Sequence, residues 1–247
     1  MLADTTSNLY NQKMSKDKAL KGLPAGRQEK EWDKYWTKKQ TASQKIYRLI
    51  ASFYRQFIIK RALNHFLAKE FKKGADLLHA GSGSGQVDEN TAKKFDITAL
   101  DISAEALKLY KKYNGESSKI LKASIFDIPV KNSSFDGIYN LGVHEHFMAS
   151  ENAKILKEFY RILKEDGKIV LFWPPKFGIS VMFLNSLHFI LNDLLRRKIR
   201  LHPDEVSLIT SKKHVEALLK ENGFKLTGFY FGIKDLFTYC VVIAKKL

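Results

Sequence analysis

The chain has 247 residues, of which 45% are hydrophobic, and this length suits one sizeable domain with its own core. Its single cysteine, Cys240, excludes an internal disulfide and a cysteine-based metal cluster, and we expect no metal site. The net charge of +16 raises the question of nucleic-acid or membrane partners, but +11 of it belongs to residues 1–74, which hold 17 Lys and Arg against 6 Asp and Glu.

Residues 1–30 form a polar, basic segment that we expect to be flexible. The segment is poor in apolar residues and has two glycines and a proline between positions 22 and 26. It contains no apolar block followed by a small-residue cleavage site, which favours a cytoplasmic protein. We interpret the basic charge of the N-terminal region as a solvated helical surface and tail, so specific nucleic-acid binding is not expected.

Residues 31–73 predict one or two amphipathic helices that precede the main domain. No proline or glycine occurs from Glu31 to Phe71, and apolar residues between Ile46 and Leu67 recur at helical spacing. Gly74 ends this pattern. Residues 74–247 then alternate short apolar runs with helical stretches.

This alternation predicts an α/β fold with a doubly wound, mostly parallel sheet of seven strands, covered by helices on both faces. Only residues 232–235 separate the last two strands, and a connection so short permits a hairpin but no parallel crossover. The sheet should therefore end in an antiparallel hairpin. The expected strands are Asp76–His79, Ile97–Leu100, Ile120–Ile125, Gly137–Leu141, Lys168–Phe172, Lys225–Phe231 and Tyr239–Ala244, and the expected helices are Asp88–Lys94, Ala104–Tyr113, Ser150–Leu163 and Lys212–Glu221.

A glycine-rich turn, Gly81-Ser82-Gly83-Ser84-Gly85, follows the first expected strand and leads into a helix. In doubly wound sheets, ligands bind beyond the carboxyl ends of the strands. Glycines allow positive φ and leave no Cβ between backbone and ligand, while a helix N-terminus offers N–H groups to an anion. The spacing is GxGxG and not GxGxxG, which weakens the case for a dinucleotide. A tight structural connection remains the alternative.

The next two strand ends carry groups suited to a nucleoside. Asp101 ends the second strand, where a carboxylate accepts hydrogen bonds from both hydroxyls of a ribose; capping the next helix is the alternative role, which Ser103 could fill as well. At the end of the third strand, Ile125 or Phe126 offers an apolar surface to an adenine ring. The acceptors there for an exocyclic amine are Ser124 and Asp127.

Four segments of the chain resemble, in order and spacing, the successive motifs of class I S-adenosylmethionine-dependent methyltransferases. These segments are LLHAGSGSG, TALDIS, ASIFDIPVKNSSFDGIYNLGVHEHF and FYRILKEDGKIVLFWPP. The chain is most similar to the small-molecule, type 11-like group, which includes quinone-biosynthesis enzymes. The resemblance spans about residues 75–175. It implies S-adenosylmethionine as the cofactor. By the resemblance, the residues that contact it are Gly81, Gly83 and Gly85 at the methionine and ribose, Asp101 at the ribose, Ser124 and Ile125 at the adenine, Asn140 beside the transferred methyl group, and Ile102 elsewhere on the cofactor.

Two positions depart from the family pattern. His79, also placed at the cofactor, stands where many members have an acid that helps to hold the cofactor's amino group. Ser124 stands where many members have an adenine-contacting aspartate. Asp127 is the residue that could compensate for the second change. Backbone carbonyls can also accept hydrogen bonds from an ammonium or an amine.

The sequence His144-Glu145-His146 follows the fourth strand, at the expected mouth of the pocket. Methyl transfer from a sulfonium depends mainly on positioning, and a base is needed only for acceptors such as a hydroxyl or phenol. His144 and His146 are the candidate catalytic bases. The alternative for His146 is structural, because the corresponding family histidine often caps the following helix.

Two nucleic-acid chemistries are disfavoured. Trp173-Pro174-Pro175 follows the fifth strand, whereas the Pro-Pro motif of DNA and RNA adenine methyltransferases follows the fourth, so we interpret this sequence as a strand terminator. Cytosine C5 methylation needs a thiolate, and Cys240 lies in the last strand, far from the pocket.

A helical insertion is expected after the fifth strand, at about residues 176–205. It contains the apolar run FGISVMFLNSLHFILNDLL, whose polar residues argue against a membrane-spanning helix, followed by a basic flank at residues 196–200. We expect a lid over an acceptor pocket; peripheral contact with an anionic membrane on the cytoplasmic side is the alternative. The pocket residues would be Trp32, Tyr35, Trp36, Trp173, Phe183 and Leu187.

The sequence therefore predicts methyl transfer from S-adenosylmethionine to a small-molecule or lipid-like acceptor, at oxygen or carbon. RNA methylation and a non-catalytic nucleotide-binding module are the alternatives.

Overall fold

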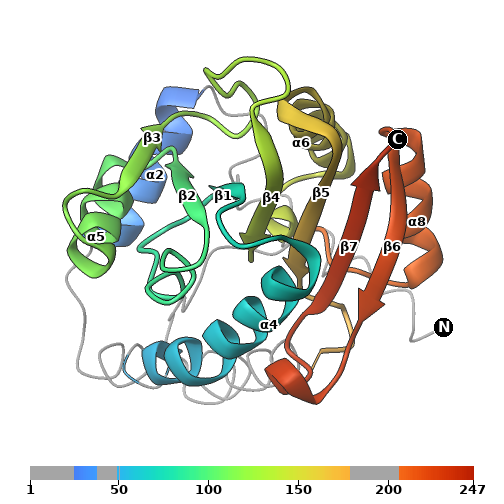
Figure 1. Ribbon diagram of the computed structural model, residues 1–247, viewed down its shortest axis with the longest axis horizontal. Coiled ribbons are helices and arrows are strands. Elements are labelled where there is room, and N and C mark those ends of the chain that lie inside the picture. Colours follow the sequence, from blue (N-terminus) through green and yellow to red (C-terminus); the bar gives the residue numbers. More distant parts are fainter. Residues whose placement is uncertain (1–24, 38–48, 50, 179–205) are drawn as a thin grey trace, which may run out of the picture.

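The computed structural model describes residues 25–37, 49, 51–178 and 206–247. Seven strands form one sheet in the order β3-β2-β1-β4-β5-β7-β6 (Figure 1). β1 to β5 pair in parallel, and β7 is antiparallel to both of its neighbours. This is the predicted doubly wound sheet with a C-terminal hairpin. The strands are β1 (Asp76–Ala80), β2 (Asp96–Asp101), β3 (Lys119–Lys122), β4 (Phe135–Leu141), β5 (Leu163–Trp173), β6 (Phe224–Tyr230) and β7 (Cys240–Lys246).

Helices cover both faces of this sheet. α4 crosses in front of it in Figure 1, and α6 lies behind. Ser103 and Ser211 cap α5 and α8, accepting hydrogen bonds from backbone N–H groups of the first turn, as serine commonly does. The helices are α2 (Ala25–Thr37), α4 (Lys60–Glu70), α5 (Ala104–Asn114), α6 (Ala149–Ile162) and α8 (Lys212–Glu221), with a π-helical turn η1 (Arg55–Ile59) and short 3₁₀ turns η2 (His144–His146) and η4 (Ile233–Asp235).

Two cores lie on opposite faces of the sheet, and β5 contributes to both. Ile169 and Leu171 point into the core beneath α6 and α8, while Val170 and Phe172 point into the core beneath α4. All four side chains are fully buried. A parallel sheet covered on both faces explains why these strands are continuously apolar in sequence. Cys240 is buried within β7, as its apolar surroundings predicted.

The structure corrects the sequence prediction at four places. β5 begins at Leu163, which was predicted to end a helix, and not at Lys168. The expected helix at Asp88–Lys94 is a series of turns whose hydrogen bonds alternate between three- and four-residue spacing. β3 ends at Lys122 and not at Ile125, because a turn closes between Ser124 and Asp127. α2 begins at Ala25, within the segment expected to be flexible.

The described ends of the predicted insertion lie side by side. The Lys176 N–H donates to the carbonyl of Ile209 at 2.9 Å, and the Ile209 N–H donates to the carbonyl of Pro174 at 3.1 Å. Residues 179–205, with most of the predicted lid and its basic flank, lie outside the described residues. Among the helices that the structure describes, none combines the length and the apolar character needed to cross a membrane.

Candidate active site

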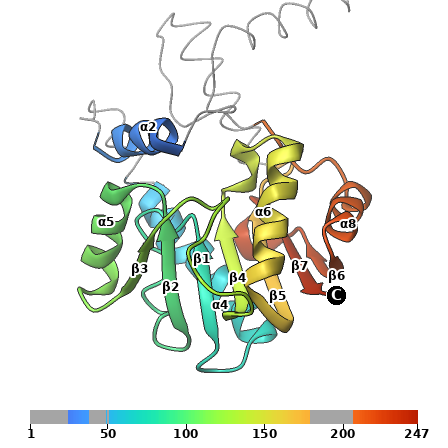
Figure 2. The ribbon, with the colours of Figure 1, turned by 90° about the horizontal axis from the view of Figure 1, so that it is seen from above.

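A cavity of about 330 Å³ lies at the carboxyl ends of the parallel strands, beneath α2. The tips of β1, β2 and β4 form its floor, and α2 lies across this end of the sheet, next to α5 (Figure 2). Of the predicted cofactor residues, His79, Gly81, Gly83, Gly85, Asp101, Ile102, Ser124 and Ile125 line it. The strand order changes direction between β1 and β4, so the cavity occupies the switch point of the sheet.

The glycine-rich turn needs glycine for both conformation and space. Gly81, Gly83 and Gly85 have φ of +71°, +52° and +63°, a region that favours glycine. A Cβ on Gly81 would lie 2.7 Å from Val143 Cγ2, and one on Gly85 would lie 2.2 Å from Tyr110 Cδ2. A side chain at Gly81, Gly83 or Gly85 would displace Val143, Trp36 or Tyr110, so only glycine lets the turn pack this closely beside the cavity.

The N–H groups of this turn largely bond within the protein. Gly81 and Ser82 both donate to the carbonyl of Leu100, at 2.8 and 2.9 Å, and Gly85 donates to the carbonyl of Ser82. No regular helix follows the turn, so the expected helix N-terminus for an anion is not formed. The role left for the turn is to let a ligand lie close to the backbone.

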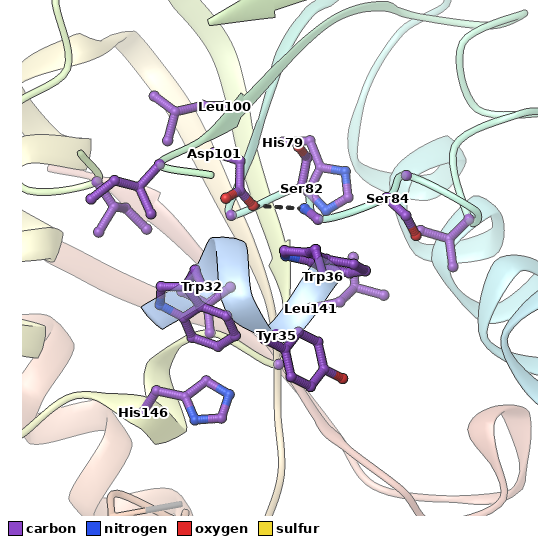
Figure 3. A pocket seen from close by; sticks show the side chains of 18 of the residues that line it. Trp32, Tyr35, Trp36, His79, Ser82, Ser84, Leu100, Asp101, Leu141 and His146 are labelled. Atoms are coloured by element: carbon purple, nitrogen blue, oxygen red, sulfur yellow. Dashed lines mark hydrogen bonds between the residues drawn. The ribbon is translucent and has the colours of Figure 1, made fainter. Parts of the chain in front are cut away.

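Asp101 holds the turn against β2. Its carboxylate accepts a hydrogen bond from the Gly83 N–H at 2.8 Å, the dashed line at Asp101 in Figure 3. It also accepts one from the Ser103 N–H at 2.9 Å. Burial raises the pKa of Asp101, and these backbone hydrogen bonds oppose the rise. The helix-capping role belongs to Ser103, whose hydroxyl accepts from Ala106 N–H.

The end of β3 provides an apolar wall with one hydroxyl. Ile125 is buried and Ser124 is half-buried, and both line the cavity. Asp127, the residue expected to compensate for Ser124, is exposed and is not among the lining residues. Phe126 packs edge-to-face on Phe147, with ring centroids 5.2 Å apart.

Three aromatic side chains of α2 form the roof of the cavity. Figure 3 shows Trp32, Tyr35 and Trp36 projecting from this helix into the space bounded by Asp101 and His146. Trp32 packs edge-to-face on His146 with centroids 5.4 Å apart, and Trp36 lies so close to the glycine turn that a Cβ on Gly83 would be 3.0 Å from its ring. The roof therefore spans the cavity from the glycine turn to η2.

Polar contacts fasten α2 to the sheet domain. The Asp33 carboxylate accepts hydrogen bonds from the Ser103 hydroxyl and, at 3.4 Å, from the Glu105 N–H. This places a negative charge at the N-terminus of α5, where the helix dipole favours it. Glu29 forms an ion pair with Lys122 at 2.6 Å, at the end of β3.

The two predicted bases occupy different environments. His146 lines the cavity. His144 is buried and outside the cavity lining; its Nδ1 is 2.7 Å from Asn152 Oδ1, and its ring stacks on Trp173. Burial lowers the pKa of His144 to about 4, which makes it a weak base.

The structure does not bring every predicted residue to the cavity. Asn140 is fully buried in β4 and lies outside the lining. Trp173 is also outside it, and its indole N–H donates to the carbonyl of Ser207 at 2.6 Å. Phe183 and Leu187 belong to the residues that the structure does not describe.

Sequence reasoning missed several lining residues. Glu145, between the two predicted histidines, is buried and lines the cavity, as does Tyr239. Because β7 runs antiparallel to β5, the residue before it must lie at the ligand-binding edge, so the predicted hairpin contained the signal for Tyr239. Arg55 and Ile59, the ends of the π-helical turn η1, also line the cavity. Such turns are frequent at functional sites, but no sequence signal marks this one.

A glycine-cradled cavity at the switch point of a doubly wound sheet defines a nucleotide-cofactor enzyme of the α/β class. Residues 78–171 match the family described as "Methyltransferase domain". This match and the doubly wound sheet make residues 78–171 a methyltransferase domain with the class I fold, and S-adenosylmethionine is the cofactor of such a domain.

The chain is similar to several named methyltransferases. It is 28% identical over 208 residues to a ubiquinone/menaquinone biosynthesis C-methyltransferase of Geotalea daltonii, covering 74% of this chain and 86% of that one. Its fold resembles magnesium protoporphyrin IX methyltransferase from Synechocystis with bound S-adenosylhomocysteine (TM-score 0.60, 15% identity, 87% of this chain and 93% of that one). It also resembles the 1,6-didemethyltoxoflavin-N1-methyltransferase of Burkholderia thailandensis (TM-score 0.54, 18% identity, 76% of each chain).

Proposed function

We propose that this methyltransferase acts on a small-molecule or lipid-like acceptor, at oxygen or carbon, held beneath the aromatic roof of α2. The observation that carries the proposal is the enclosure of the cavity by Trp32, Tyr35 and Trp36. Aromatic side chains provide flat apolar surfaces on which a ring or chain can pack.

The residues around the cavity fit the cofactor. Gly81, Gly83 and Gly85 would lie under its methionine and ribose, where a Cβ would meet other atoms. The Asp101 carboxylate, next to Ile102, would accept from the ribose hydroxyls, and Ser124 and Ile125 would contact the adenine. S-adenosylmethionine supplies an electrophilic methyl group on a sulfonium.

The names of similar proteins support a ring-containing acceptor. They describe enzymes of quinone biosynthesis, of magnesium protoporphyrin IX and of 1,6-didemethyltoxoflavin. Each name refers to a compound with a planar ring system. Stacking on an indole ring would orient such a ring and hold the accepting atom in line with the methyl group.

His146 is the proposed base for an acceptor that must lose a proton. It lines the cavity on the side of Trp32, and its ring packs against this tryptophan. An imidazole titrates in a range suited to deprotonating an activated phenol or hydroxyl. We assign no proton transfer to His144, because it lies outside the cavity.

The contacts made where the insertion returns to the domain support its assignment as a second cover of the acceptor pocket. The N–H groups of Val206 and Ser207 donate to the carbonyl of Glu145, at 2.6 and 3.1 Å, so the returning chain is bonded to a residue of the cavity wall. The insertion therefore leaves and re-enters the domain beside the cavity. Phe183 and Leu187 would contribute from this segment, and contact of its basic flank with an anionic membrane remains the alternative role.

The test is methylation profiling of metabolite and lipid extracts with isotopically labelled S-adenosylmethionine. Label should appear in a small or lipid-like compound, and Trp32→Ala should lower kcat/KM for it by about five- to tenfold while changing cofactor affinity little, because a stacking contact is worth about 1 to 1.4 kcal/mol. Lys34→Ala, on an exposed position of α2, is the matched control. Label only in RNA would overturn the proposal.

A further inference from the structure

A fully buried carboxylate lies next to the cavity. Asp88 has no exposed surface and accepts three hydrogen bonds, from the Tyr110 hydroxyl at 2.8 Å, the Tyr139 hydroxyl at 2.8 Å and His79 Nδ1 at 2.6 Å. Its three partners come from α5, β4 and β1. Burying a charge costs free energy unless hydrogen bonds compensate for the lost water, and a fully bonded network of this kind fixes the positions of its side chains.

The network determines which ring nitrogen of His79 carries a proton. Burial, with the charge of Asp88, raises the pKa of both Tyr110 and Tyr139, so both phenols keep their protons and donate. A carboxylate only accepts, so the bond from His79 is donated by Nδ1–H. In the neutral imidazole, Nε2 then carries the lone pair.

His79 presents this imidazole to the cavity. His79 is one of the lining residues, and its side chain is labelled in Figure 3. Its ring stacks on Tyr139, with centroids 4.4 Å apart and planes 26° apart, so the ring cannot turn without breaking this contact and the bond to Asp88. Within the described part of the chain, Nδ1 is the ring nitrogen engaged with a partner. Nε2 is therefore the atom that can meet a ligand.

The hydrogen-bonding role of Nε2 selects the kind of ligand group. With the proton on Nδ1, Nε2 presents a lone pair to the cavity, and the Asp88 carboxylate lies behind the ring. Such a group favours an ammonium over a carboxylate. The methionine portion of S-adenosylmethionine contains both groups, and the glycine turn beside His79 underlies the part of the cavity proposed for it.

We propose that Asp88 is a positioning residue for cofactor binding that acts through His79, whose Nε2 accepts a hydrogen bond from the cofactor's amino group. In this arrangement the carboxylate of Asp88 does not contact the cofactor itself, because the imidazole ring of His79 lies between the two. This inference rests on the cofactor and not on the proposed acceptor, so it can fail or hold independently of the function proposed above.

The experiment compares dissociation constants for S-adenosylhomocysteine and for its analogue that lacks the amino group, measured by calorimetry without any acceptor. The wild-type protein should bind the complete ligand about 10- to 100-fold more tightly, which is the size expected for a hydrogen bond to a charged group. His79→Leu and Asp88→Asn should reduce this ratio to about 1 to 5, because either change removes the acceptor or its charge.

Two further variants separate this role from loss of structure. The double variant H79D/D88N places the carboxylate directly at position 79 and should restore the ratio. Tyr110→Phe removes a donor to the same Asp88 oxygen but leaves the pair with His79, so it should lower stability and keep the ratio. Because each ratio compares two ligands on one folded variant, destabilisation alone does not change it.

Two results would overturn the proposal. One is a wild-type ratio near 1. The other concerns the affinity that His79→Leu loses relative to the wild-type protein. If this loss also occurs with the amine-free ligand but not with a ligand that lacks the carboxylate, the imidazole donates to the ligand's carboxylate and does not accept from its amino group.

Discussion

Asp101 is the residue at which the cofactor proposal is most directly testable. Its half-buried carboxylate lines the cavity at the tip of β2. Asp101→Ala should weaken binding of S-adenosylhomocysteine by about 10- to 100-fold in calorimetry, because a hydrogen bond to a charged group contributes about 1.5 to 3 kcal/mol.

A control is available on the same strand. Asp96, at the start of β2, is exposed and paired with Lys119, so Asp96→Ala should leave affinity unchanged. Equal affinity of Asp101→Ala and the wild-type protein would remove Asp101 from the site.

Two buried groups give opposite contributions to stability at acidic pH. Burial lowers the pKa of His144 to about 4, from an ordinary value of 6.5, so its contribution to stability is present above pH 6.5 and is lost as pH falls to 4. Burial raises the pKa of Asp235 to about 6, from 3.8, so its contribution is present below pH 3.8 and is lost as pH rises through 6. Each amounts to about 3 kcal/mol.

In the wild-type protein these two contributions should nearly cancel between pH 7 and pH 4. His144→Gln should therefore gain about 3 kcal/mol of unfolding free energy relative to wild type when the pH is lowered from 7 to 4, and Asp235→Asn should lose about as much. Urea unfolding at the two pH values measures both changes. If both variants show the wild-type pH dependence, neither group titrates as its burial implies.

At the level of elements, the attachment of α2 should depend on Asp33. Asp33→Ala removes the hydrogen bonds to the N-terminus of α5, and one hydrogen bond to a charged group contributes about 1.5 kcal/mol. Amide hydrogen exchange in residues 28–37 should become about tenfold faster. The control is Lys34→Ala, which breaks only an exposed pair with Glu31 on the same helix. Equal exchange in both variants would show that Asp33 does not hold the helix.

Sequence patterns identified most helices and strands, because the spacing of apolar residues along the chain reflects which side chains are buried. Lys212–Glu221 was predicted to the residue, and the short connection after β6 correctly implied the hairpin. The turns at residues 85–95 were not predictable, because the side chain of Asp88 enters a core made by residues distant in sequence. The start of α2 was missed for a similar reason: its roof position depends on contacts with α5 and β3 that local composition does not contain.

The same distinction holds for the candidate site. Gly81, Asp101 and Ile125 were found from strand ends, since the fold class fixes where such ends meet. Asn140 lies near the end of β4 and His144 follows that strand, yet their side chains are buried outside the cavity lining. Which side of a strand tip faces the cavity depends on twist and packing, and sequence position alone does not specify it.

For the whole molecule, the net charge of +16 allows a test of the alternative acceptor class. Binding to bulk RNA should be weak, with a dissociation constant above about 1 μM at physiological salt, and it should fall steeply as salt increases because it depends on release of counterions. Removing residues 1–30 should weaken it further. Fluorescence anisotropy across a salt series measures both effects. Submicromolar affinity combined with methyl incorporation into RNA would favour an RNA methyltransferase.

The placement of α2 also bears on the order of events during turnover. α2 reaches the glycine turn through Trp36 and His146 through Trp32, so this one helix lies over the regions proposed for both the cofactor and the acceptor. A rigid helix cannot lift from one end of the cavity without disturbing the other. Both products should therefore depart during the same opening of the cover, and the spent cofactor should be retained until the methylated compound is also able to leave.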